Sequence, residues 1–375
     1  MTATEARPAE RRSIMSRVGL IAGPVAFLIP LLIDIPELSE AGERVLGVFA
    51  LAIVLWVTEA IPLYATAALV ILLEIVLVSD QALVALPDGI EAPTYRTFFN
   101  ALAHPVLMLF LGGFFLARGS AKFRLDRALA GVLLKPFGDR PGSIMLGIML
   151  ITAGFSMFMS NMAVTATMIA VVLPVVAKLE PGDRLRPALV LAIPIAANIG
   201  GMGTPVGTPP NAIAVGQLAS AGIEVSFAKW MALAVPAVAV VLLAAWWMMG
   251  RAFPTSTAKI ELEMDAAFDR SRHAKVFYVT FALTVALWLT EAVHGLPSGV
   301  VGFLPVVVFL SVGIFDAEDL RRVQWDVLWL VAGGIALGVG VAGSGLDEWL
   351  VGRISWESLA PTLIVGFLAV AALVF

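Results

Sequence analysis

Long apolar segments alternate with short polar or charged connections along almost the whole chain of 375 residues. A helix needs about 20 apolar residues to cross the hydrocarbon core of a bilayer. The pattern therefore predicts an all-α polytopic membrane protein. The apolar segments are residues 17–34, 43–61, 62–79, 103–117, 141–178, 185–220, 228–250, 275–293, 297–315, 325–345 and 358–375.

The composition leads to the same prediction. Hydrophobic residues make up 60% of the chain and charged residues 14%, whereas soluble domains average about 25% charged residues. Cysteine is absent, which excludes disulfides and cysteine-ligated metals. We expect membrane lipid around the protein and no nucleic-acid partner. The weight of Ala, Val and Gly favours a bacterial inner membrane.

The charge of the connecting segments predicts their side of the membrane, because Lys and Arg concentrate on the cytoplasmic side. Lys and Arg recur in four segments, which we place in the cytoplasm. These are the N-terminal tail 1–16, the segments 118–140 and 178–186, and the linker 251–274. The acidic segment 80–98 contains Arg96 as its single cation, and we place it outside.

Residues 141–178 begin and end on the same predicted side, so the chain must enter the membrane and return. The turn falls at Ser160 and Asn161, a polar pair inside an apolar run. The charge pattern allows either a half-depth re-entrant hairpin or two full spans. Ser and Asn cap helix N-termini well, whereas a two-residue polar turn is poorly suited to face bulk water. We therefore favour the re-entrant hairpin.

Residues 185–220 predict a broken helix. The segment Leu185–Ala197 precedes a stretch rich in Gly and Pro, and at about 1.5 Å per residue it crosses only half of the membrane. A second short helix is expected to begin near Ala212. Irregular backbone at membrane depth is tolerated only where it is buried in protein or lines a cavity. The break therefore marks a candidate binding site.

Two short blocks of the first half recur in the second half. Residues 55–60 correspond to 287–292 at an offset of 232 (287 − 55), and residues 106–113 correspond to 327–334 at an offset of 221 (327 − 106). The second block runs through the membrane in opposite predicted directions in the two halves. Chance similarity is the alternative explanation. Two ordered blocks with reversed orientation favour inverted repeats, which place a substrate near the midplane.

These observations divide the chain into a first half, 17–250, and a second, inverted half, 275–375. The first half holds scaffold helices, the hairpin and the broken helix. The offset of 221 puts the counterpart of Asn161 at position 382 (161 + 221), beyond Phe375. We therefore expect the second half to be truncated within its own hairpin, which begins near Leu359.

The hairpin tip offers what a travelling anion needs in place of water. A helix N-terminus presents free N–H groups and about half a positive charge, whereas a fixed Arg or Lys is costly inside the membrane. Asn161 adds amide donors and Ser160 adds a hydroxyl. The alternative is a hydrogen-bonded pair that only joins helices. We favour a site because the polar tip and the broken helix occur together.

The same region offers oxygen ligands for a small hard cation such as Na⁺. Ser156 lies one turn before the tip, and the break at Gly200–Gly203 exposes backbone carbonyls. The repeat-related carboxyl groups of Glu59 and Glu291 could carry protons. We interpret them as capping residues at the membrane interface.

At these residues the chain resembles the divalent anion/sodium symporter family of the ion transporter superfamily. That family carries a Ser-Asn-Thr tripeptide at the tip of each of two hairpins, and a Gly-rich Thr-Pro-x-Gly-Thr-Pro-Pro-Asn loop that breaks the following helix. The resemblance covers essentially the whole chain. The matching residues are Ser160-Asn161 and, after Gly200 and Gly201, the run Thr204-Pro205-Val206-Gly207-Thr208-Pro209-Pro210-Asn211.

The resemblance implies a homodimer in which a transport domain moves against a scaffold domain, as an elevator. It also implies uptake of succinate, malate, fumarate, citrate or, in some members, sulfate, coupled to Na⁺ ions and without an organic cofactor. By matched position, the first sodium site is formed by Ser156, Ser160, Asn161 and the carbonyl of Gly203. The substrate is expected to face Ser160, Asn161, Met162, Thr204 and Pro205.

One departure concerns specificity, because Met162 stands where the family has Thr and removes a hydroxyl donor. We predict a sodium-coupled symporter of small divalent anions such as C4-dicarboxylates. The alternative is a proton-coupled or exchange carrier of the same fold for sulfate or another anion. An anion channel is disfavoured by the midplane hairpin. An intramembrane enzyme is a remote alternative, since Ser344 offers a nucleophile but the three histidines lie at span ends.

Overall fold

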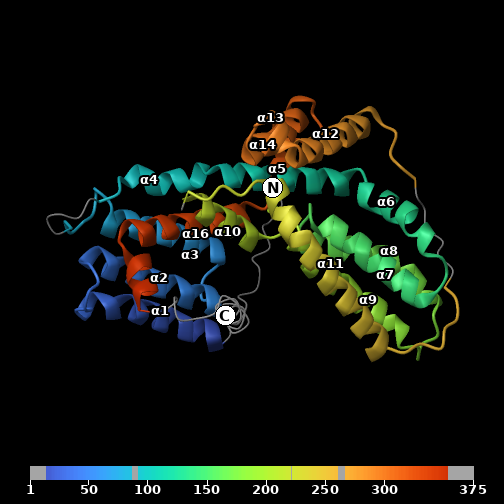
Figure 1. Ribbon diagram of the computed structural model, residues 1–375, viewed down its shortest axis with the longest axis horizontal. Coiled ribbons are helices and arrows are strands. Elements are labelled where there is room, and N and C mark those ends of the chain that lie inside the picture. The colour runs from blue at the N-terminus through green and yellow to red at the C-terminus, as the bar shows by residue number, and fades with distance from the viewer. Residues whose placement is uncertain (1–13, 87–91, 221, 261–266, 354–375) are drawn as a thin grey trace, which may run out of the picture. The chain divides into compact units, whose positions relative to one another are not determined.

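Every regular element in the described residues is a helix, which confirms the all-α prediction (Figure 1). The computed structural model describes residues 14–86, 92–220, 222–260 and 267–353. Six helical segments among these residues are long and apolar enough to cross a membrane, in agreement with a polytopic membrane protein. They are Ile14–Leu32, Glu40–Thr58, Tyr95–Lys122, Asn161–Lys178, Phe227–Ala252 and Trp325–Gly343.

The chain forms two units, which are described separately. The first unit comprises Met1–His104 and Trp329–Phe375, and the second comprises Pro105–Leu328. The described helices of the first unit are α1 (Ile14–Leu32), α2 (Glu40–Thr58), α3 (Leu63–Val78), α4 (Tyr95–Asn100), the 3-10 helix η1 (Ala101–Ala103), most of α16 (Trp325–Gly343) and α17 (Leu346–Gly352).

Small residues bring the helices of the first unit close together, as expected where dispersion contacts must hold helices in lipid. Gly19 of α1 faces Thr58 at the end of α2, and a side chain at Gly19 would collide with it. Helix α2 packs in turn on α3. Their shared apolar core is formed by Val48, Ala52, Val70 and Leu337.

Small residues also join α3 to α16. Gly333 lies against Ala67, and Gly340 lies against the carboxyl group of Glu74. In both helices the two contacts are seven residues apart (74 − 67 and 340 − 333), about two helical turns. The same two faces therefore stay in contact along both helices, and the absence of a side chain at Gly340 leaves the space that Glu74 fills.

The second unit contains the hairpin and the broken helix. Its described helices are α5 (Pro105–Lys122), α6 (Leu125–Leu133), the 3-10 helix η2 (Lys135–Phe137), α7 (Pro141–Ser156), α8 (Asn161–Lys178), α9 (Leu185–Gly201), α10 (Pro209–Ser220), α11 (Phe227–Ala252), α12 (Arg272–Leu289), α13 (Glu291–His294), α14 (Ser298–Ser311) and α15 (Ala317–Arg321). Helix α16 begins in this unit.

The main apolar core of the second unit lies among α7, α8, α9 and α11, which run together in Figure 1. Each of these helices contributes fully buried aliphatic or methionine side chains. Examples are Ile148, Met168, Ile193 and Leu242. Through this core the hairpin packs against the first half of the broken helix. The candidate site is therefore positioned by packed helices.

Helices α5 and α14 approach one another through glycine. A Cβ atom on Gly112 would overlap the carbonyl of Gly302, and a Cβ atom on Gly302 would lie 2.8 Å from the Cα atom of Leu109. Both obstacles are backbone atoms, which cannot rotate out of the way. The two helices therefore depend on the missing side chains for their separation.

The hairpin and the broken helix are both present as pairs of helices. Helices α7 and α8 pack together across a turn at residues 157–160, and residues 202–208 separate α9 from α10. Helix α9 continues beyond Ala197, and α10 begins at Pro209 instead of near Ala212, because proline suits the first turn of a helix. The re-entrant depth and the inverted repeats stay predictions. The second hairpin, from Leu359, lies outside the described residues.

We expect Gly112→Ala to lower the free energy of unfolding by about 1–3 kcal/mol, since the added methyl group must push two backbones apart. The matched control is Gly250→Ala in α11, where the new Cβ atom would meet Met145 Cε at an ordinary 3.9 Å. Thermal unfolding of the purified protein in detergent measures both variants. An unchanged midpoint for Gly112→Ala would contradict the close approach of α5 and α14.

Candidate functional site

The hairpin tip is a short turn with polar groups at both helix ends. Helix α7 ends at Ser156 and α8 begins at Asn161. Ser160 is the N-cap of α8, and its side-chain oxygen accepts a hydrogen bond from the backbone N–H of Ala163 at 3.3 Å. The first turn of a helix has N–H groups without intrahelical partners. The tip therefore presents the donor end of a helix.

A chain of side-chain hydrogen bonds crosses from the tip to the broken helix. Ser156 Oγ donates to Asn161 Oδ1 at 2.7 Å, and Asn161 Nδ2 donates to Asn198 Oδ1 at 3.0 Å. Asn198 lies one turn before the end of α9. Gly201 makes room for this chain, because a Cβ atom there would lie 2.6 Å from Asn161 Oδ1. Asn161 therefore joins the two polar segments that the sequence singles out.

Two buried side chains close the loop between α9 and α10. The hydroxyl of Thr204, fully buried, donates to the carbonyl of Met157 in the hairpin turn. Asn211 Nδ2 donates to the carbonyls of Gly201 at 3.0 Å and Thr204 at 2.8 Å. The carbonyls at the break thereby receive partners that no continuing helix supplies, which matters because unpaired polar groups are costly in apolar surroundings.

Glycines let the loop pack on the hairpin. A Cβ atom on Gly200 would overlap the backbone of Ala153 in α7, and one on Gly203 would lie 2.8 Å from Met157 Cε. A Cβ atom on Gly207 would overlap the carbonyl of Gly201 at the end of α9. Pro205 in the loop is also buried, whereas Thr208 and Pro209 are partly exposed and Met202 and Pro210 are exposed.

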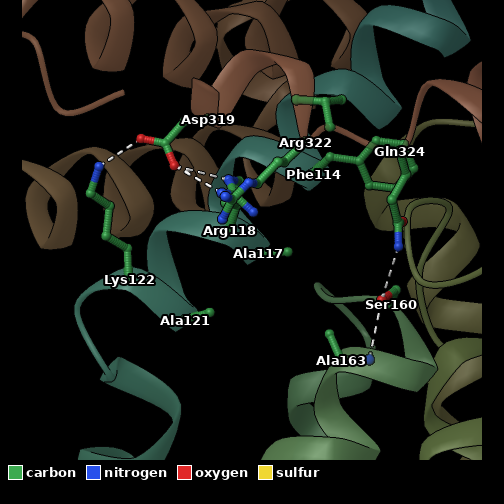
Figure 2. Close-up of a pocket in the computed structure, with 11 residues that line it drawn as sticks. Phe114, Ala117, Arg118, Ala121, Lys122, Ser160, Ala163, Asp319, Arg322 and Gln324 are labelled. Carbon is green, nitrogen blue, oxygen red and sulfur yellow. Dashed lines mark hydrogen bonds and ion pairs between the residues drawn. The ribbon is translucent and has the colours of Figure 1, made fainter. Parts of the chain in front are cut away.

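Met162 and Ser160 differ from the rest of the predicted site. The side chain of Met162 is 82% exposed, so protein packing does not occupy it and it is available to a ligand. Ser160 accepts a hydrogen bond from Gln324 Nε2 at 3.5 Å (Figure 2). The two oxygens assigned to one sodium site, those of Ser160 and Asn161, thus have different protein partners.

The oxygen donors at the tip fit a small hard cation. Ser156 Oγ, Asn161 Oδ1 and Asn198 Oδ1 are neutral oxygens within one hydrogen-bonded chain, and the loop adds backbone carbonyls such as that of Gly203. Oxygen ligands are those that hard cations prefer. In the part of the chain that the structure describes, no group of three or more His, Cys, Asp or Glu side chains is placed to hold a metal ion. The donor set therefore suits Na⁺ better than a transition metal.

Two contact residues carry no role in the sequence-based prediction. Asn198 opens the Gly-rich stretch, and a lone amide in the apolar run of α9 was a usable signal. Gln324 lies just before an apolar segment, where a polar residue is ordinary. Only the folded structure brings it within 3.5 Å of Ser160.

Glu74 is a third residue that the sequence-based prediction missed, although a single carboxyl group in the apolar segment 62–79 was visible. It is fully buried in α3, and neither oxygen has a hydrogen-bond partner within the described residues. The repeat-related carboxyl groups of Glu59 and Glu291 have ordinary surroundings. Glu59 is the C-cap of α2, and Glu291 accepts a hydrogen bond from Ser298 Oγ at 2.6 Å.

Known proteins that are similar to this chain are membrane transporters. The sequence model of a family described as "Citrate transporter" matches residues 53–375. The "Sodium-dependent dicarboxylate transporter SdcS" of Staphylococcus saprophyticus is 33% identical over 386 residues, which cover 93% of this chain and 72% of the relative. The protein of the same name from Staphylococcus aureus strain USA300 is 33% identical over 387 residues, with the same coverage.

The helical fold and these similarities define a multi-pass membrane transporter, not an enzyme. The chain belongs to the citrate transporter family, and its identification as a member of the divalent anion/sodium symporters is confirmed. The family match spans both the hairpin and the broken helix, since it covers residues 53–375.

We expect Asn211→Ala to lower the free energy of unfolding by about 1–3 kcal/mol, because two buried carbonyls lose their donor. The matched control is Asn100→Ala, at an exposed position at the end of α4. Thermal unfolding in detergent compares the two variants. Equal midpoints would mean that Asn211 does not hold the loop closed.

Proposed function

We propose that this protein is a sodium-coupled symporter that carries small dicarboxylates, such as C4-dicarboxylates, into the cell. The names of both relatives support the substrate class and the coupling ion. The observation that carries the proposal is the hydrogen-bonded chain Ser156–Asn161–Asn198, because it puts neutral oxygens beside the N-terminus of α8.

The anion half of this proposal rests on the tip. A carboxylate that leaves water needs donors, and the first turn of α8 provides backbone N–H groups together with the positive end of a helix dipole. We assign the substrate contacts to Ser160, Asn161, Met162, Thr204 and Pro205. Thr204 also positions the loop, because its hydroxyl donates a hydrogen bond to the carbonyl of Met157.

The proposed binding of sodium depends on the oxygen atoms of the same region. A cation bound by Ser156, Ser160, Asn161 and the carbonyl of Gly203 would lie next to the anion and offset its charge. Each net positive charge that moves inward gains about 2.3 kcal/mol per 100 mV of membrane potential. Transport of more sodium charge than anion charge therefore drives accumulation.

The larger-scale features of the proposal follow from the family resemblance and the charge pattern. We place the protein in the bacterial inner membrane with its N-terminus in the cytoplasm, as a homodimer that works by an elevator movement. The basic segments 118–140 and 178–186 support this orientation.

A proton-coupled or exchange carrier of the same fold is the second candidate. Glu74 favours it, because its buried carboxyl group has no hydrogen-bond partner within the described residues, and such groups inside membrane helices are a common feature of proton pathways. Uptake that persists when choline replaces Na⁺ would support this candidate over the sodium symporter.

We expect Asn161→Ala to abolish sodium-dependent succinate uptake in proteoliposomes, because the change removes the atoms that join the tip to Asn198. Ser156→Ala should retain uptake but raise the sodium concentration for half-maximal rate by about tenfold, equivalent to about 1.4 kcal/mol, because Na⁺ loses one oxygen ligand. Ser256→Ala, at an exposed loop position, is the matched control. Near-normal sodium-dependent uptake by Asn161→Ala would refute the site.

We expect Met162→Thr to change the order of preference among succinate, citrate and sulfate, since this exposed residue is available to the ligand. The measurement is inhibition of labelled succinate uptake by each unlabelled anion. Leu173→Thr, an exposed position in the same helix, controls for a general effect on α8. An identical inhibition profile for Met162→Thr would exclude it from the substrate contacts.

A further inference from the structure

A cavity of about 440 Å³ opens beside the hairpin tip, within the second unit (Figure 2). Three segments line it: α5, the tip of the hairpin, and the connection from α15 to α16. The tip contributes Ser160 and Ala163. The cavity therefore shares a wall with the candidate site but extends away from it to residues that the proposed function does not use.

The α5 side of this cavity carries two cations, Arg118 and Lys122, among apolar side chains. Arg118 and Lys122 lie four residues apart on α5, on the same face of that helix. Arg118 Nη2 and Lys122 Nζ both bind the carboxylate of Asp319, at 3.0 Å and 2.7 Å. The two cations share a single carboxylate, so this cluster keeps a net positive charge at the wall of the cavity.

Arg322 adds a third cation to the lining. Its partner is Glu318, with Arg322 Nε 2.9 Å from Glu318 Oε1. Both side chains are more than half exposed to solvent, and exposed pairs of this kind are weak and easily exchanged. An anion in the cavity can therefore compete for Arg322.

The opposite wall carries neutral donors. The Gln324 amide reaches the Ser160 hydroxyl at 3.5 Å, which is at the long limit of a hydrogen bond. Both groups can therefore turn to a ligand at little cost. The remaining lining is mostly apolar, with Phe114, Ala117 and Val323 among its members, and suits the hydrocarbon centre of a small diacid.

We propose that this cavity is a transient binding site for a dicarboxylate, in which one carboxylate of the substrate displaces Asp319 from Lys122 and Arg118 while the other is bound by Ser160 and Gln324. This inference rests on the proposed function and extends it from the tip to the route between the tip and solvent. Asp319 acts as a positioning residue, because it holds both cations in place and competes with the substrate for them.

Competition requires that Asp319 stays ionised. Burial, the largest single effect, raises the pKa of Asp319. The hydrogen bonds from Lys122, Arg118 and the backbone N–H of Asp316, together with the charge of Lys122, outweigh it, so that the pKa of Asp319 lies below its ordinary value. The carboxylate is therefore charged at neutral pH. Because it already occupies the cations, the cavity binds a dianion weakly enough to release it.

The effect of mutations distinguishes an ion cluster that only stabilises the fold from one in which Asp319 competes with the substrate. If Asp319, Arg118 and Lys122 only hold helices together, then removal of either sign of charge weakens the protein in the same direction. If they form a substrate site, loss of a cation weakens dicarboxylate binding, and loss of the carboxylate strengthens it.

The kinetic test measures the KM for succinate from each side of proteoliposomes in which the protein has one orientation. We expect Lys122→Gln to raise the KM about tenfold on one side only, as for loss of a charged hydrogen bond. Asp319→Asn should lower the KM on that same side. Arg321→Gln, an exposed cation outside the cavity, is the matched control. Shifts of the same sign for Lys122→Gln and Asp319→Asn, or equal effects on both sides, would overturn the proposal.

A second measurement does not depend on transport. Because the chain contains no cysteine, an introduced cysteine is the only thiol that can react. Ala121 is an exposed residue that lines the cavity, and Ser256 is exposed in a distant loop segment. We expect Ala121→Cys to react with an anionic thiol reagent about tenfold faster, relative to a cationic one, than Ser256→Cys does. Succinate should slow the reaction at Ala121→Cys alone.

The two measurements separate failure of this inference from failure of the proposed function. If the wild-type protein takes up no succinate, the proposed function fails, and the thiol reaction still decides whether the cavity binds the anion. If the wild type transports succinate but Ala121→Cys shows no preference for the anionic reagent and no protection, the inference alone is wrong.

Discussion

The structure depends on one constraint: a helix that is interrupted inside an apolar bundle must find other partners for its free backbone groups. The break at residues 202–208 meets this constraint through Asn211, whose amide reaches two carbonyls, and through Thr204, which binds the hairpin turn. The hairpin tip meets it through the N-cap Ser160. Each interruption is stabilised partly by the other, so the hairpin and the broken helix form one polar cluster.

This cluster and the neighbouring cavity use different electrostatics. The chain Ser156–Asn161–Asn198 consists of neutral groups, which can serve a cation through oxygen and an anion through N–H without a fixed charge. The charged side chains line the neighbouring cavity, where Arg118 and Lys122 both bind the carboxylate of Asp319. Neutral dipoles at the tip and paired charges at the neighbouring cavity suit a carrier that must both bind and release its substrate.

Much of the fold could be predicted from the sequence, because apolar length and the position of Gly and Pro are local properties. The hairpin turn at Ser160 and the break after Gly201 follow from such signals. The end of α9 was placed too early, since Gly200 and Gly201 continue the helix by packing against Ala153 and Asn161. Gln324 could not have been found, because its proximity to Ser160 exists only in the folded chain. Glu74 was visible as a lone acid, but the sequence does not show that α16 buries it.

The repeat blocks gain a physical explanation from the packing. Gly112 and Gly333 occupy corresponding positions at the offset of 221 (333 − 112), and each gives its helix a close contact, with Gly302 and Ala67 respectively. The shared sequence is thus accounted for by shared packing, α5 on α14 and α16 on α3. This similarity supports the predicted inverted repeats, although it concerns only one helix pair in each unit.

The most direct test concerns the proposed binding of sodium by the neutral side chains between the tip and the broken helix. Thermal unfolding of the wild type and of Asn161→Ala, each with increasing NaCl at constant total chloride balanced by choline, tests this binding without any need for transport. We expect sodium to stabilise the wild type by about 2.7 kcal/mol at a hundredfold excess of Na⁺ over its dissociation constant, and not to stabilise Asn161→Ala. The same sodium-dependent stabilisation in both proteins would contradict sodium binding at these side chains.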